Sequence, residues 1–357
     1  MNLRKKLLLG IGLALVITFT LVALFSYQAM DTSYRSLERH EVEKATGTSN
    51  NALQTDLRNT YAVARDYSAW TDTFRFADGT NPGWIDQNMG GDFFSRFNVD
   101  AVLVFNRSGE LIFARENPNN PTQDKTVSPS IVEKIQDLNT ARTILSSSEG
   151  SYEILESPAG PVILASHPIL TDNLKGPAAG SLHIVRRIDT QYENDLSTRT
   201  GNRIALVSAS SVSGTASQAG VLAGITREQP VGVIPENEDL ISGYSIPENL
   251  TTPGSYYLKV TIPRDIYMTG QANTITFLVS LLGAWIFITL FILLFVDRVI
   301  LSRLNTIIGT IRRRKSGKNN NAGLESRDEL AQLAFAIDPI FAELAESIAP
   351  QGKFGLI

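Results

Sequence analysis

Two long apolar runs stand out in the pattern of hydrophobic and polar positions. Leu7–Phe25 and Phe277–Val296 contain no charged side chain. At a rise of ~1.5 Å per residue, about 20 apolar residues span the ~30 Å hydrocarbon core of a bilayer. We therefore predict two transmembrane helices, over residues 7–27 and 273–296, whose side chains contact membrane lipid.

The second apolar run continues directly into a basic segment with heptad spacing. Its apolar residues lie four, three and four positions apart, the spacing of a coiled-coil seam: Ile300, Leu304, Ile307 and Ile311. A second set with such spacing follows: Leu330, Leu333, Ile337, Ile340 and Leu344. A plain membrane anchor with a polar tail would not need such a seam directly after the span. We therefore interpret this helix as one that transmits a movement from the membrane to the cytoplasmic segment.

Between the two runs, the pattern predicts an α+β domain. Residues 31–67 show helical spacing without proline and predict one long membrane-proximal helix. Short apolar stretches bounded by turn residues predict five strands, with a helix beginning at Ser128-Pro129 after the second of them. The five predicted strands cover residues 101–105, 111–114, 152–155, 162–169 and 180–186. Their hairpin connections favour one antiparallel sheet with a helical flank, the outline of a PAS-like sensor module.

The segment after this sheet leads back to the membrane. Asp189 is a good N-cap for a helix that ends near Thr200. Residues 203–207 and 256–261 predict two further strands, the second of which leads into the helix of the second span. Ser208–Gly220 is rich in Ser, Ala and Gly and predicts a mobile loop. Both spans are thus tied to one folded unit, and a change in its shape would move one span relative to the other.

The densest aromatic stretch follows the long helix and supplies the candidate ligand site. Tyr67, Trp70 and Phe74 are three and four positions apart, which predicts one helix face. We favour core packing over ligand contact for this face, and both interpretations stay open. Asp72 is a second candidate, with capping or pairing to a nearby arginine as its alternative role. His167 is the last candidate, although a packed strand histidine is the commoner case.

Charge defines the expected topology. Lys and Arg flank the cytoplasmic ends of spans, and they cluster at Arg4–Lys6 and again at Arg312–Lys315. Both termini are therefore expected in the cytoplasm, with residues 31–272 outside. No cleavable signal is expected, because the first apolar run is longer than a signal peptide requires. The chain has no cysteine, so disulfides and thiolate metal sites are excluded.

Several short motifs resemble a known sensor family. Asp66–Phe74 contains a Tyr-x-x-Trp-x-Asp sequence that resembles the signature of the extracytoplasmic CHASE sensor domains, type four. Further matches fall across most of residues 31–190: Asn98-Val99-Asp100, Arg107-Ser108-Gly109, His167-Pro168-Ile169, Gly180-Ser181-Leu182 and Arg187-Ile188-Asp189. Pro263–Tyr267 is similar to the segment before the second span in such proteins. The resemblance implies a sensor domain over residues 28–272.

The segment after the second span resembles a HAMP linker. Residues 297–348 are similar to its helix–connector–helix plan, and Asp328, Glu329 and Leu330 are similar to the acidic start of the second helix. The resemblance implies a parallel four-helix bundle made by two subunits, and hence a homodimer. Ser302 stands where proline is common, and Pro339 interrupts the second helix at a cost of ~3 kcal/mol. The expected layout is completed by a basic N-terminus (1–6) and a tail (349–357).

These features predict a membrane sensor of signal transduction rather than an enzyme. No nucleophile–base pair, metal cluster, cofactor motif or nucleic-acid-binding pattern is recognised, and all three histidines lie in the predicted outer segment. The expected partners are an extracytoplasmic small molecule and a cytoplasmic histidine kinase or other output protein, or else the chain is a truncated sensor kinase. The alternative is a structural or adhesive membrane protein that dimerises through its heptads. The sequence names neither ligand nor output partner.

Overall fold

The computed structural model describes residues 3–118, 129–137, 144–146, 149–158, 160–174, 176–212 and 216–302. The chain divides into two compact units. One holds the described residues up to Ser33 and from Gly270 onward, and the other is Tyr34–Thr269. The first unit contains the apolar segments of the candidate membrane helices, and the second contains the α+β domain.

The candidate membrane helices belong to α1 (Leu3–Ser68) and α10 (Asp265–Phe295). Both are long and apolar enough to cross a bilayer, and the most apolar window of each is fully unburied. The predicted spans 7–27 and 273–296 lie within these helices. The Trp285 indole N–H donates to the backbone carbonyl of Leu15 (3.1 Å), and its ring lies 5.8 Å from that of Phe19. A π-helical turn, Val296–Leu301, follows α10.

Five antiparallel strands form the first sheet of the α+β domain, in the order β2-β1-β5-β4-β3. Their bounds are β1 (Ala101–Asn106), β2 (Leu111–Glu116), β3 (Ser151–Ser157), β4 (Gly160–Ile169) and β5 (Gly180–Arg187). Helix α5 (Pro129–Asp137) lies between the second and third strands in sequence. The predicted antiparallel sheet with one flanking helix is therefore confirmed.

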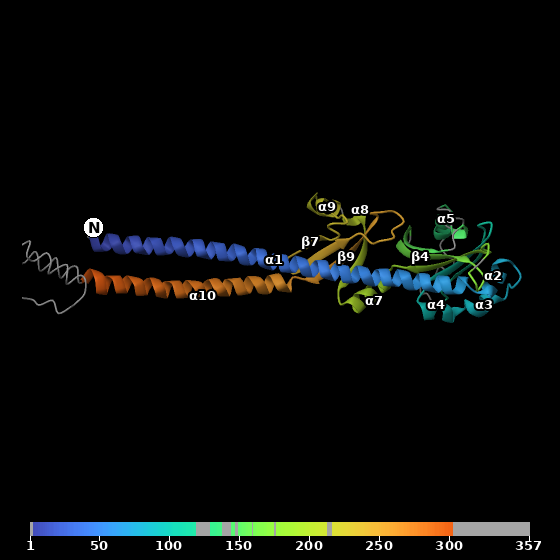
Figure 1. Cartoon of the computed structure of the whole chain (residues 1–357), viewed down its shortest axis with the longest axis horizontal. Coiled ribbons are helices and arrows are strands. Elements are labelled where there is room, and N and C mark those ends of the chain that lie inside the picture. The colour runs from blue at the N-terminus through green and yellow to red at the C-terminus, as the bar shows by residue number, and fades with distance from the viewer. Residues whose placement is uncertain are drawn as a thin grey trace, which may run out of the picture. The chain divides into compact units, whose positions relative to one another are not determined.

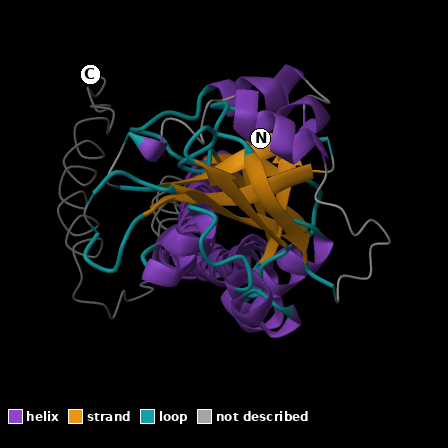
Figure 2. Cartoon of the chain, turned by 90° about the vertical axis from the view of Figure 1, so that its right-hand side faces the viewer, coloured by secondary structure: helices purple, strands orange, loops and turns teal. Residues whose placement is uncertain are grey.

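Side chains from both faces of this sheet are buried. Val102, Val104 and their neighbours pack against α1 and three short helices, α2 (Thr71–Ala77), α3 (Trp84–Asn88) and α4 (Gly91–Phe97). Leu103 and Phe105, on the opposite face, pack with Ile131 and Ile135 of α5. Figure 1 shows α5 on one side of the sheet and α3 and α4 on the other, and Figure 2 shows strands between helices. Burial on both faces explains why β1 is a continuous apolar run.

A second antiparallel sheet has the order β6-β9-β8-β7. Its strands are β6 (Arg203–Ser208), β7 (Gly232–Pro235), β8 (Leu240–Ser245) and β9 (Tyr256–Pro263). The sequence predicted β6 and β9 but not the two short strands beside them. Gly243 weakens the strand signal of β8, yet the structure requires it, because a Cβ atom there would overlap Thr46 Oγ1 of α1.

The connections around the second sheet contain one confirmed helix and one wrong prediction. Asp189 caps α7 (Thr190–Thr200) by accepting a hydrogen bond from the Tyr192 N–H (2.9 Å), as predicted. Ser208–Gly220 was predicted as a loop, but α8 (Ala209–Val212) and α9 (Ala216–Ala223) lie there. The apolar side of α9 overrides its Ser/Ala/Gly composition, since Leu222 is buried with Ile234 and Tyr244. Residues 213–215 lie outside the described part.

One hydrophobic core links α1 to both sheets. Leu53 and Leu57 of α1 pack with Ile154 of β3 and Leu258 of β9, among others. The backbone N–H of Ile154 also donates to the Asn249 carbonyl (2.7 Å), which joins the first sheet to the segment after β8. Helix α1 therefore contacts both sheets through one core.

The predicted relay is only partly within the described residues. Ile300 lies in the π-helical turn that follows α10. The other relay residues lie outside the described part of the chain: Leu304, Ile307, Ile311, Asp328, Glu329, Leu330, Leu333 and Ile337. The predicted linker over 297–348 and its dimer stay predictions.

Candidate functional site

The predicted aromatic face is built differently from the expectation. Helix α1 ends at Ser68, and Trp70 is the N-cap of α2 with an extended backbone (φ −88°, ψ 135°). Tyr67, Trp70 and Phe74 therefore do not share one helix face. The chain turn instead stacks the rings of Tyr67 and Trp70 at 4.7 Å, and Phe93 meets Tyr67 edge-on at 4.9 Å. These rings belong to the core beneath the first sheet.

Asp72 lies outside this core. Its side chain is exposed and its carboxylate lies 3.4 Å from the Arg75 guanidinium, which is also exposed. The carboxylate that caps the start of α2 is Asp172, which accepts from the Thr71 N–H at 2.5 Å. Hydrogen bonds from Thr71 lower the pKa of Asp172. Sequence reasoning missed this contact, because the two residues are far apart in the chain.

His167 is a packed strand histidine, buried on β4. Its Nδ1 lies 2.6 Å from Ser68 Oγ at the end of α1 and 2.9 Å from the Pro168 carbonyl. Burial lowers the pKa of His167, because the charged imidazolium loses its hydration there. His167 thus fastens the end of α1 to the sheet.

Motif residues that carried the family resemblance also have structural roles. Asn98 adopts the left-handed conformation (φ 53°, ψ 50°) that ends α4, and Asp100 accepts from the Arg187 N–H at 2.7 Å. A Cβ atom at Gly180 would overlap the Phe105 carbonyl, so the pairing of β5 with β1 requires glycine there. These positions therefore contribute to the folding of the domain.

His183 of β5 is expected to make the domain sensitive to acid. It is fully buried, with Ser166 Oγ 2.7 Å from Nδ1 and Ser181 Oγ 2.8 Å from Nε2. Burial lowers its pKa from 6.5 to about 3. Below pH 6.5 the unfolded chain therefore binds a proton that the folded chain does not, and stability falls as pH falls towards 3. The loss at pH 5 should be ~2 kcal/mol from this group.

The measurement compares His183→Gln with the native chain by denaturation in mild detergent at pH 7 and pH 5. The glutamine variant should lose less stability between the two pH values, whatever its stability at pH 7. Equal losses in both proteins would show that His183 does not titrate in this way.

A buried carboxylate on α1, Asp56, joins three elements. Tyr192 donates its hydroxyl to Asp56 (2.9 Å), and Arg199 contacts both oxygens at 3.1 and 2.6 Å. Arg186 of β5 lies 3.7 Å away and is itself 11% exposed. Burial, and secondarily the Asp56 charge, raise the pKa of Tyr192. Asp56 thus couples α1 to the first sheet and to α7.

A second buried ion pair couples α1 to the start of α10. Glu38 Oε1 and Oε2 accept from Arg264 Nε and Nη2 at 2.9 and 3.1 Å, the bidentate geometry that arginine favours. The side chains are 5% and 12% exposed. The Arg264 guanidinium also lies over the Tyr267 ring at 4.5 Å, and Arg35 lies over the same ring at 5.3 Å. Two elements distant in sequence are therefore held together at this point.

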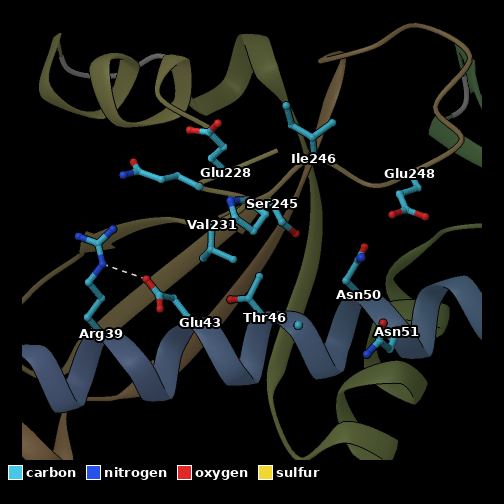
Figure 3. A pocket seen from close by; sticks show the side chains of 13 residues that line it. Arg39, Glu43, Thr46, Asn50, Asn51, Glu228, Val231, Ser245, Ile246 and Glu248 are labelled. Atoms are coloured by element: carbon cyan, nitrogen blue, oxygen red, sulfur yellow. Dashed lines mark hydrogen bonds and ion pairs between the residues drawn. The ribbon is translucent and has the colours of Figure 1, made fainter. Parts of the chain in front are cut away.

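A groove of about 510 Å³ lies between α1 and the second sheet. Thr46 and Asn50 extend from α1 on one side, with Ser245 and Ile246 opposite (Figure 3). A second cavity of about 490 Å³ lies nearer the start of α10 and is lined in part by Glu38. None of the predicted ligand-binding residues lines either cavity: Tyr67, Trp70, Asp72, Phe74 and His167. Within the described residues, no three or more His, Cys, Asp or Glu side chains could hold a metal ion.

Comparison with protein families identifies the central part of the chain. The CHASE4 domain matches residues 52–221. The chain thus contains a region similar to the CHASE4 domain, over a little under half of its length. Its match covers the aromatic core, the first sheet, α7, β6 and α8, and it ends within α9, before β7. The five predicted ligand residues lie inside it, whereas every residue that lines the 510 Å³ groove lies outside it.

A curated relative supports a signalling role. The chain is 24% identical over 347 residues to the methanogenesis regulatory histidine kinase FilI of Methanothrix harundinacea (strain 6Ac). The alignment covers 96% of this chain but only 38% of FilI, so the chain spans well under half of that relative. Together with the CHASE4 domain and the two candidate spans, this similarity supports a membrane sensor.

Two solved structures match the chain with low TM-scores and low identity. The periplasmic domain of Vibrio cholerae LuxQ matches with a TM-score of 0.41 at 9% identity, over 62% of this chain and 99% of that structure. The sensor domain of the Vibrio cholerae histidine kinase DctB matches with a TM-score of 0.38 at 10% identity, over 65% and 98%. At these scores the likeness carries nothing about ligand or activity.

Proposed function

We propose that this chain is a transmembrane receptor whose domain between the spans binds a small molecule or protein outside the cytoplasm. The CHASE4 domain, the two candidate spans and the similarity to a histidine kinase support this role. Basic residues before the first span, at Arg4–Lys6, and after the second, at Arg312–Lys315, favour cytoplasmic termini, with residues 31–272 extracytoplasmic.

The buried Glu38–Arg264 pair is the observation that carries the relay. Glu38 lies on α1, the helix that contains the first candidate span, and Arg264 directly precedes α10, which contains the second. Both helices are continuous from the α+β domain into their apolar segments. Because a partly broken buried ion pair leaves an uncompensated charge, the pair tends to move as a unit. Displacement of α1 within the domain is therefore passed to α10.

The cytoplasmic side would complete the relay. Residues 297–348 form a HAMP-like helix pair in this proposal, and two subunits bury its apolar seams in a parallel homodimer. Output then comes from a histidine kinase or another protein, or from a further module, as in the longer relative.

A crosslinking experiment tests the relay. The chain lacks cysteine, so Leu304→Cys places a single thiol in the predicted seam. Oxidation in native membranes is expected to give a disulfide-linked dimer. Adding Glu38→Gln, which removes the charge that holds Arg264, should change the disulfide yield, because the movement reaches the cytoplasmic helices.

The matched control is Glu41→Gln, an exposed substitution three residues further along α1. It should leave the yield as in Leu304→Cys alone. Absence of any dimer would contradict the homodimer and its relay. A dimer whose disulfide yield is unchanged by Glu38→Gln would favour the structural or adhesive alternative, in which the heptads only join subunits. Melting temperatures of both variants show that each remains folded.

A further inference from the structure

The groove between α1 and the second sheet has the size of a small-molecule site. Its volume of about 510 Å³ lies within the ~300–1,000 Å³ range of ligand pockets. One wall is a helix that contains a candidate span, and the other is formed around the end of β8. A ligand held between these walls would therefore contact the element on which the proposed relay depends.

Two buried polar atoms at this groove have no hydrogen-bond partner in the described structure: Asn50 Oδ1 and Ser245 Oγ. Ser245 is only 6% exposed and lines the groove together with Asn50. Figure 3 shows their side chains entering the space from opposite walls. Buried polar groups normally find a partner, so such atoms mark a place where one is supplied from outside. The amide oxygen is an acceptor only, so its partner must be a donor.

The charges around the groove define the sign of that donor. Glu43, Glu228 and Glu248 line it, against one basic residue, Arg39. Arg39 pairs with Glu43 at 2.9 Å, which leaves two carboxylates to set the local charge. Thr46 already donates its hydroxyl to the Val42 carbonyl and keeps only acceptor capacity. Asn50 Oδ1 can only accept and Ser245 Oγ can accept as well, and the surrounding field is negative. This combination favours a cation that carries N–H donors.

We propose that this groove binds a small organic ammonium compound between α1 and β8. Its ammonium N–H groups donate to Asn50 Oδ1 and Ser245 Oγ, while Glu228 and Glu248 neutralise the charge. The lining residues lie outside the CHASE4 match, so this site is separate from the aromatic core of that domain. The inference deepens the proposed receptor function and rests on it for its signalling consequence, but not for binding.

Binding is tested on the full chain in mild detergent by isothermal titration and thermal shift. The probes are ethanolamine and putrescine, which carry N–H donors, choline, which has a cation without them, acetate and calcium chloride. Saturable binding of ethanolamine or putrescine is expected, with choline, acetate and calcium weaker.

Variants place the binding in the groove. Ser245→Ala removes one acceptor and should weaken binding ~10-fold or more, as for a lost hydrogen bond to a charged group. Gly47→Leu should abolish it, since Gly47 lines the groove and a Cβ atom there meets nothing within 4 Å, leaving room for a side chain to fill the space. The matched controls are Ser242→Ala on the same strand and Thr55→Leu on the exposed side of α1, which line neither wall. Both should bind as the native chain does.

Failure to bind either amine, preference for acetate or calcium, or binding that survives both groove variants would overturn the assignment. The outcome is separable from that of the crosslinking experiment, which uses no ligand. Amine binding together with a Leu304→Cys disulfide yield that Glu38→Gln leaves unchanged would retain the site and remove the relay.

Discussion

Asp56→Ala is expected to cost about 3–5 kcal/mol of unfolding free energy, the usual loss when one partner of a buried ion pair is removed. Asp56 is 4% exposed and receives hydrogen bonds from Tyr192 and Arg199, with Arg186 3.7 Å away. Without the carboxylate, Arg186 stays buried beside a neutral methyl group, and the Tyr192 hydroxyl loses its acceptor. The effect should also loosen α1 from the first sheet and from α7.

The matched control for Asp56 is Asp195→Ala. Asp195 pairs with the same arginine, Arg199, at 3.2 Å, but it is 51% exposed and four residues away on one helix. Surface pairs of this kind contribute ~0–1 kcal/mol, because water screens them. Chemical denaturation of both variants in detergent gives the comparison. Equal, small losses would show that the Asp56 cluster is not a buried electrostatic centre.

Phe94→Ala is the second change with a large expected effect, about 3–5 kcal/mol, because it leaves a cavity in the core beneath the first sheet. Phe94 lies on α4, is fully buried and meets the Phe93 ring edge-on at 5.5 Å. Trp70→Ala should cost less than Phe94→Ala, since Trp70 is only partly buried at the edge of that core.

Ile112→Ala provides the control for Phe94, because Ile112 is 39% exposed on β2 and its truncation opens no internal cavity. Thermal unfolding ranks the Phe94→Ala, Trp70→Ala and Ile112→Ala variants by stability. The domain with Trp70→Ala should stay folded, which then allows its ligand response to be measured separately. A Phe94→Ala protein as stable as Ile112→Ala would mean that the aromatic core is not the stabilising part of this domain.

Local pattern was sufficient for the elements whose signal lies within their own residues. Twenty uncharged residues predict a span, helical spacing without proline predicts the outer part of α1, and apolar runs between turn residues predict β1 to β5. Asp189 predicts the start of α7 because an N-cap acts on the two or three residues that follow it. Each of these depends on interactions between neighbours in the chain.

Other features depend on residues that only the tertiary structure brings together. The helical spacing of Tyr67, Trp70 and Phe74 was interpreted as one face because nothing local marks the turn after Ser68. Helix α9 forms in a Ser/Ala/Gly-rich segment because its apolar side has β7 and β8 to pack against.

The sequence alone determined that two apolar helices flank an α+β domain along the chain, because length and periodicity are local properties. The buried ion pairs and the groove were decided by tertiary structure. Asp56 lies 143 positions from Arg199, and Glu38 lies 226 from Arg264. Asn50 and Ser245 line one groove from opposite ends of the domain sequence. Sequence periodicity does not indicate such pairs, because it is the packing of α1 against both sheets that brings the partners together.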